Sequence, residues 1–147
     1  MHRTLFILFV SLAVLVGGVL YLYSSPTEVP PRVLYTYMNA SSNDIVVYAP
    51  QPRAEISKTF SITGNARGQW YFEASFPISI LDASGATLLQ THATADGEWM
   101  TEAFVPFSVD ISLPSGYTGP ATIVLNKDNP SGLPEHDASV SFQVIVK

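Results

Sequence analysis

The stretch WYFEASFPISIL, residues 70–81, decides the fold class because apolar and polar side chains alternate along it. One face of the expected strand is apolar and consists of Trp70, Phe72, Ala74, Phe76, Ile78 and Ile80. The other face carries Tyr71, Glu73, Ser75, Pro77 and Ser79. Successive side chains of a β-strand point to opposite sides, so this alternation predicts a half-buried strand over Trp70–Leu81. Pro77 lacks a backbone N–H and should therefore lie at an edge or a bulge.

Period-two patterns continue on both sides of this stretch. They predict strands at 45–48, around 60–62, and at 87–95, 103–113, 121–125 and 140–146. Turn residues separate them at Asp82–Gly85, Asp96–Gly97 and Pro114–Gly116. Seven short strands with regularly spaced turns predict an all-β, immunoglobulin-like antiparallel sandwich over residues 44–147. A small barrel is the alternative architecture.

Composition limits the kinds of partner. The chain has 147 residues, enough for one domain, and a formal net charge of −5. It contains no basic run, which argues against a nucleic-acid partner because such binding depends on clustered Lys and Arg. It contains no cysteine, which excludes a disulfide framework, a thiolate metal site and a cysteine nucleophile.

The N-terminal segment Leu5–Tyr23 reads LFILFVSLAVLVGGVLYLY, nineteen residues without a charge. Roughly 20 apolar residues can cross a bilayer as a helix, so we expect a transmembrane signal anchor, with residues 1–4 as a short cytoplasmic end. The alternative is a cleaved signal peptide, although the apolar run is long for one and Pro26 makes a poor cleavage context. Both interpretations place the C-terminal domain outside the cytoplasm. The anchor predicts a single-pass protein of the cell membrane.

Residues 24–43 are expected to form a stalk between the membrane and the sandwich. Pro26, Pro30 and Pro31 favour an extended and stiff backbone. The apolar run 33–37 within the stalk is able to dock on another surface.

Four motifs in order carry a resemblance to a known family. They are GNARGQWYFEASFP at 64–77, GEW at 97–99, FVPF at 104–107 and DNPSGLPE at 128–135. In these residues the chain resembles the immunoglobulin-like domain of bacterial spore germination, over about residues 44–147. The resemblance implies an extracytoplasmic module, often behind a signal or membrane anchor, with no established catalytic residues. It is not taken to imply a role in germination.

The loop between the last two expected strands, residues 126–137, is the main candidate for a partner-binding surface. Loops at the ends of sandwiches are common recognition surfaces, and prolines stiffen this one. Asn129 could cap backbone donors, and Gly132 could supply a turn with positive φ. A loop that only packs over the sandwich end would have the same features. The candidate residues are Asn129, Pro130, Ser131, Gly132, Leu133, Pro134 and Glu135.

Two further residues are candidate surface contacts. Glu73 is either a ligand contact or has a structural role, as the partner of Arg67 or Arg53 in an ion pair or in a backbone contact. Phe104 is out of phase with the apolar face of its strand and is expected on the opposite face. Together with Trp99, it could stack on a sugar ring of a wall polymer or cover a sheet edge.

No residue set predicts catalysis, a metal or a cofactor. His92 lies within an expected strand among threonines, and Ser131 lacks the strand–turn–helix context of a hydrolase nucleophile. The acidic residues near His136 lack the alternating spacing of a calcium loop. The chain is therefore not expected to be an enzyme.

The leading functional hypothesis is a membrane-anchored, non-catalytic module that binds a protein or a cell-wall polymer at the cell surface. The alternative is a structural accessory subunit of an envelope complex, assembled through the transmembrane helix, where Gly17 and Gly18 permit close helix approach. A cell-wall hydrolase is the least supported hypothesis.

Overall fold

The computed structural model describes residues 34–147, so the predicted transmembrane helix and the first part of the predicted stalk lie outside the described residues. Within them, no helix reaches the length and hydropathy that a membrane span requires. Nine strands and two 3-10 helices are present: β1 (Thr36–Met38), β2 (Ile45–Ala49), β3 (Glu55–Ile56), β4 (Thr59–Arg67), η1 (Gly68–Trp70), β5 (Ser75–Leu81), β6 (Thr87–Ala95), β7 (Phe104–Ser112), β8 (Gly119–Asn126), η2 (Pro134–His136) and β9 (Ser139–Val146).

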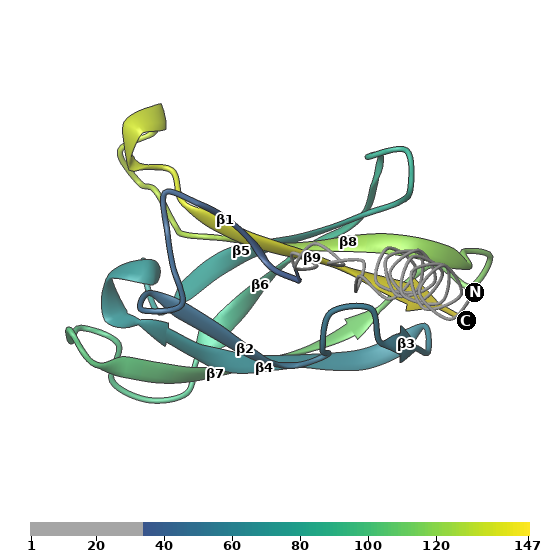
Figure 1. Cartoon of the computed structure of the whole chain (residues 1–147). Helices are drawn as coiled ribbons and strands as arrows, with labels where there is room; N and C mark the ends of the chain where they lie inside the picture. Colours follow the sequence, from purple (N-terminus) through teal and green to yellow (C-terminus); the bar gives the residue numbers. More distant parts are fainter. Residues whose placement is uncertain (1–33) are drawn as a thin grey trace, which may run out of the picture. The chain divides into compact units, whose positions relative to one another are not determined.

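The strands pair in the order β1-β9-β8-β5-β6-β7-β4-β2, and β3 also pairs with β9. Figure 1 shows this path folded into two layers, with β2, β4 and β7 in one layer and β1, β5, β8 and β9 in the other. β6 joins the layers, because it pairs with β5 along its length and with β7 only at Thr94 and Ala95. The predicted all-β, immunoglobulin-like sandwich is confirmed. The path does not close into a barrel, since β1 and β2 at its two ends do not pair with each other.

Alternating apolar side chains from both layers fill the core, which is what period-two patterns produce when two sheets pack face to face. Phe76 lies within an aromatic cluster, with its ring centroid 5.0 Å from that of Phe107 and 5.2 Å from that of Tyr71. Gly64 leaves the space that this cluster needs, because a Cβ there would lie 2.6 Å from the Phe107 ring. This packing ties β4, β5 and β7 together.

All seven predicted strands are present, and β6 has the predicted bounds. The structure adds β1 and β3, which both pair with the outer edge of β9. β3 runs parallel to β9, so the sheet is not antiparallel throughout. β1 lies inside the region that was predicted to be a stalk, and its pairing with β9 makes residues 36–38 part of the sandwich. Thr36 and Tyr37 of the apolar run belong to β1, so this part of the run docks on β9.

The prediction of one strand over Trp70–Leu81 is wrong at its start. Residues 68–70 form the 3-10 helix η1, and β5 begins only at Ser75. Between them, Glu73 and Ala74 have positive φ angles of 49° and 62°, which no strand residue adopts. The turn shifts the alternation by one position, so Tyr71 is buried whereas Phe72 is 43% exposed. The predicted faces hold only from Ser75 onward.

Pro77 lies inside β5, which has a neighbour on each side. The ladder between β5 and β8 begins one residue later, at Ile78 and Leu125. The missing N–H of Pro77 therefore leaves no gap in that ladder. The expected edge position is wrong for β5 as a whole. At Pro77 itself, however, the strand has no ladder partner on the β8 side, as the missing N–H requires.

Candidate functional site

Four connections meet at one end of the sandwich, which we call the loop end: residues 39–44, 68–74, 96–103 and 127–138. The candidate loop is the connection from β8 to β9. Two backbone hydrogen bonds attach its base, from Lys127 N to Ala138 O at 2.8 Å and from Asp128 N to Trp70 O at 3.0 Å. The second bond joins the loop to η1, so the conformations of the two connections depend on each other.

Side chains within the candidate loop hold its shape. The Asn129 side-chain amide donates to Leu133 O at 2.8 Å and to Asp137 Oδ1 at 2.7 Å, and its Oδ1 accepts from Ser131 Oγ at 2.5 Å. Gly132 has a φ of 66°. The turn with positive φ predicted for Gly132 is therefore confirmed. The prediction that Asn129 caps backbone donors is wrong, because its amide donates to a backbone carbonyl and its Oδ1 accepts from a side chain. The loop has a defined shape although most of its residues are exposed.

A groove of about 380 Å³ runs between this loop and the segment that follows η1. Phe72 forms its apolar side, while Gln69, Asp128, Asn129 and His136 contribute polar groups. A smaller hollow of about 190 Å³ lies beside it, lined by residues from three of the four connections. An apolar surface bordered by a few fixed polar groups is the usual composition of a ligand site.

The structure brings only part of the predicted candidate set to the groove. Asn129, Pro130 and Ser131 line it, and Glu135 lines the smaller hollow. The groove also uses Phe72, which the sequence pattern assigned to the core. Phe72 is exposed because a turn shifts the alternation of buried and exposed residues. Residues 70–81 contain no glycine and no Asn–Gly pair, so the sequence does not mark this turn.

Glu73 lies in the exposed turn before β5 and does not make the predicted ion pair. Within residues 34–147, the one ion pair joins Lys147 Nζ to Glu55 Oε1 at 2.9 Å. Arg67, one of the expected partners, donates instead to the carbonyl oxygens of Asn43 and Glu102. The predicted pairing of Glu73 with Arg67 or Arg53 is therefore wrong.

Phe104 pairs with Arg67 across β4 and β7 on the outer face of that layer. The Arg67 guanidinium carbon lies 4.2 Å from the centroid of the Phe104 ring, which is a cation–π contact. Trp99 is half-buried and packs against the core. One face of the Phe104 ring is thus covered by a protein side chain, so these two aromatics do not form an open stacking surface.

The loop end carries most of the negative charge of the described residues. Of the eleven acidic residues in 34–147, eight lie in the four connections: Asp44, Glu73, Asp96, Glu98, Glu102, Asp128, Glu135 and Asp137. Lys127 is the one basic residue in the same connections. The field at this end is therefore negative and favours a partner that carries positive charge.

The candidate loop contains one pair that resembles a nucleophile and its base. Ser131 Oγ lies 2.9 Å from His136 Nδ1. The Ser131 hydroxyl also donates to Asn129 Oδ1, so it is engaged within the loop. Within residues 34–147, no carboxylate is hydrogen-bonded to His136. The same residues contain no group of three His, Asp or Glu side chains close enough to hold a metal. The pair stabilises the loop and lacks the third member of a triad.

Comparison with known proteins gives one result. A family model described as the immunoglobulin-like domain of bacterial spore germination matches residues 44–133. This match contains β2 to β8, but not β1 or β9. Neither the curated proteins nor the solved structures gave a match.

Proposed function

The chain belongs to the family of immunoglobulin-like domains of bacterial spore germination, and from this premise we propose that it is a membrane-anchored, extracytoplasmic and non-catalytic binding module. Its loop end binds a protein or a cell-wall component that carries positive charge. The groove between Phe72 and the candidate loop is the observation that carries this proposal.

Membrane anchoring is supported by the sequence of residues 5–23 alone. The uncharged run is long enough for a bilayer-spanning helix. Expression of the full chain, followed by membrane fractionation and protease treatment of intact cells, tests this part. The chain should sediment with membranes and lose its C-terminal domain to external protease once the wall has been opened.

The groove supports binding because both of its walls have a fixed shape before a partner arrives. The candidate loop is held by the hydrogen bonds of Asn129, and the opposite wall is held by the burial of Trp70 and Tyr71. A site that is already ordered loses less conformational entropy on binding. Phe72, which lines the groove, and Leu133, which lies on the candidate loop outside the groove lining, are exposed by 43% and 48%. They are the apolar side chains of the loop end that a partner would cover.

The acidic residues around the groove determine which partners are favoured. A negative rim speeds the approach of a positively charged surface and repels a negatively charged one. Binding should therefore weaken as ionic strength rises, because exposed charges farther apart than about 8 Å are largely screened in physiological salt.

The experiment uses the full chain in mild detergent, with binding to purified cell walls measured by sedimentation and binding to proteins measured by chemical cross-linking. The double variant Phe72→Ala/Leu133→Ser should lose the bound material. The control Tyr48→Ala removes an aromatic side chain that is 54% exposed on β2, away from the loop end, and should bind as the unchanged chain does.

A second variant separates this proposal from assembly through the membrane segment. Replacing residues 5–23 with an unrelated transmembrane helix should leave binding at the loop end intact. If that replacement abolishes binding while Phe72→Ala/Leu133→Ser does not, the proposal is wrong and the accessory-subunit hypothesis replaces it.

A further inference from the structure

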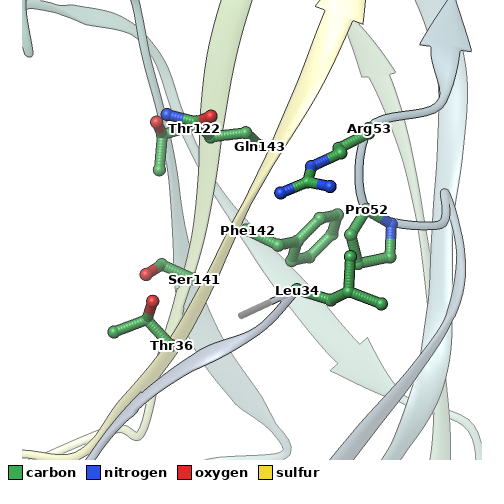
Figure 2. Close-up of a pocket in the computed structure, with 8 residues that line it drawn as sticks. All are labelled: Leu34, Thr36, Pro52, Arg53, Thr122, Ser141, Phe142 and Gln143. Carbon is green, nitrogen blue, oxygen red and sulfur yellow. The ribbon is translucent and has the colours of Figure 1, made fainter. Parts of the chain in front are cut away.

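A third cavity lies along the outer edge of β9, and none of its lining residues belongs to the four connections of the loop end. Two short strands cover this edge: β1 pairs with residues 139–141 and β3 with residues 145–146. Between them residue 53 bonds to the edge, because Arg53 N donates to Gln143 O at 2.6 Å. The cavity lies beside this bond and has a volume of about 240 Å³ (Figure 2).

One side of the cavity is apolar. Leu34, Pro52 and Phe142 lie together there in Figure 2. Leu34 is 49% exposed, although it is a large aliphatic side chain next to a strand of the domain. This wall offers a surface for a small apolar group of a ligand.

The other side of the cavity consists of hydrogen-bonding groups without negative charge. Thr36, Ser141 and Gln143 contribute two hydroxyls and an amide. Their positions follow from strand register, because Thr36 is directly opposite Ser141 and both strands present alternate side chains to this face. In Figure 2 the Arg53 guanidinium extends between Gln143 and Phe142, toward the middle of the cavity.

Arg53 is the one charged residue that lines the cavity. Within residues 34–147, its guanidinium makes no hydrogen bond and has no carboxylate within 4.0 Å, since the one ion pair there joins Lys147 and Glu55. Its backbone has a φ of 66°, a conformation that favours glycine or asparagine. Among the described residues, Arg53 is therefore a cation without a counter-charge, at the edge of a domain with more acidic than basic residues.

We propose that this cavity binds the terminal carboxylate of a peptide-like ligand, with a small apolar side chain against Leu34, Pro52 and Phe142. A guanidinium binds a carboxylate through two parallel hydrogen bonds, and the hydroxyls and amide opposite can donate to its remaining lone pairs. A single cation matches the single charge of a carboxylate better than the nearly double charge of a phosphate monoester. The site is separate from the loop end, so it does not depend on the proposed function.

The test is a ligand-observed NMR titration of the full chain in mild detergent. The probes are acetyl-Ala-Ala with a free carboxylate, in its L,L and D,D forms, the corresponding amides, and inorganic phosphate. At least one of the two carboxylates should bind, and its amide should bind at least about tenfold more weakly, the factor that loss of one charged hydrogen bond produces.

Two variants assign the binding to the cavity. Arg53→Asn removes the cation while keeping a residue that tolerates positive φ, so carboxylate binding should weaken at least about tenfold without a lower melting temperature. Lys58→Gln removes the same charge from a side chain that does not line the cavity, and it should leave binding unchanged.

The outcomes are distinct from those at the loop end, because neither variant touches the groove beside Phe72. Equal binding of acid and amide, unchanged binding by Arg53→Asn, or no binding of either carboxylate up to about 10 mM would overturn the proposal. Tighter binding of inorganic phosphate than of both carboxylates would also overturn it, in favour of a phosphate site.

Discussion

The two walls of the groove at the loop end are fixed in different ways. The segment 68–74 is held by burial: Trp70 is 1% exposed and Tyr71 4% exposed. The loop 127–137 contains no buried residue, and hydrogen bonds among exposed side chains hold it. Burial of an aromatic side chain contributes several times more free energy than an exposed hydrogen bond does. The first wall is therefore part of the folded core, whereas the second is a surface that can change without unfolding the domain.

The largest change in the free energy of unfolding is expected from a substitution in the buried wall, segment 68–74. Trp70→Ala should lower the free energy of unfolding by about 3–5 kcal/mol, because it leaves a cavity beside Phe76. Phe72→Ala, two residues away and exposed, should lower it by less than about 1 kcal/mol. Urea unfolding followed by circular dichroism measures both. Equal losses of unfolding free energy from the two variants would contradict the burial of Trp70 and the exposure of Phe72.

The next effect depends on pH. Tyr71 donates its hydroxyl to Val105 O at 2.8 Å, so Tyr71→Phe should cost about 1–2 kcal/mol at pH 7. Burial raises the pKa of Tyr71 to about 12 in the folded state, above the usual value of 10. The stabilisation by Tyr71 is therefore complete below pH 10 and is lost as the pH rises from 10 through 12.

Unfolding measured at a series of pH values should show the difference between the unchanged chain and Tyr71→Phe shrinking over this interval, by up to about 2 kcal/mol. A difference that stays constant from pH 9 to pH 12 contradicts the buried state of this hydroxyl.

A smaller effect is expected in the exposed wall. Gly132→Ala places a side chain at a φ of 66° with open space around it, so only backbone strain opposes the change, at a cost of about 1 kcal/mol. Gly116→Ala is the matched control, since it also has open space but lacks a positive φ. Thermal melts of both should show a loss for the first variant alone.

The smallest change in stability should come from Asn129→Ala. It removes the hydrogen bonds to Leu133 O and Asp137 Oδ1, both exposed, so the free energy of unfolding should fall by less than about 1 kcal/mol. Amide hydrogen exchange in residues 127–137 should nevertheless become faster, because the loop loses its local order. Unchanged exchange would mean that the backbone alone sets the shape of this wall.

Sequence patterns predicted the long strands because each has one buried and one exposed face. They did not predict β1 and β3, which have three and two residues and exist because the edge of β9 is open to them. Such short elements depend on tertiary pairing and leave no periodic signal.

The candidate site was predicted only where local chemistry is sufficient. The positive φ of Gly132 follows from residue type and is confirmed. Asn129 does shape the loop, but as a donor to Leu133 O and not as the predicted cap of backbone donors. The exposure of Phe72 and the contact of Arg67 with Phe104 depend on the phase shift at Glu73 and on the register of β4 with β7. Neither of these is encoded in a window of neighbouring residues.

The position of β9 has a consequence for how this chain can be shortened. β9 lies between β8 and the two short strands, and it contributes Val140, Phe142, Val144 and Val146 to the core. The residues that match the family, 44–133, end before this strand begins. A fragment cut to those limits would lose β9 and expose the edge of β8. An exposed strand edge can pair with the same edge of another copy and cause aggregation. The smallest piece that keeps every strand of the sandwich runs from Thr36 to Val146.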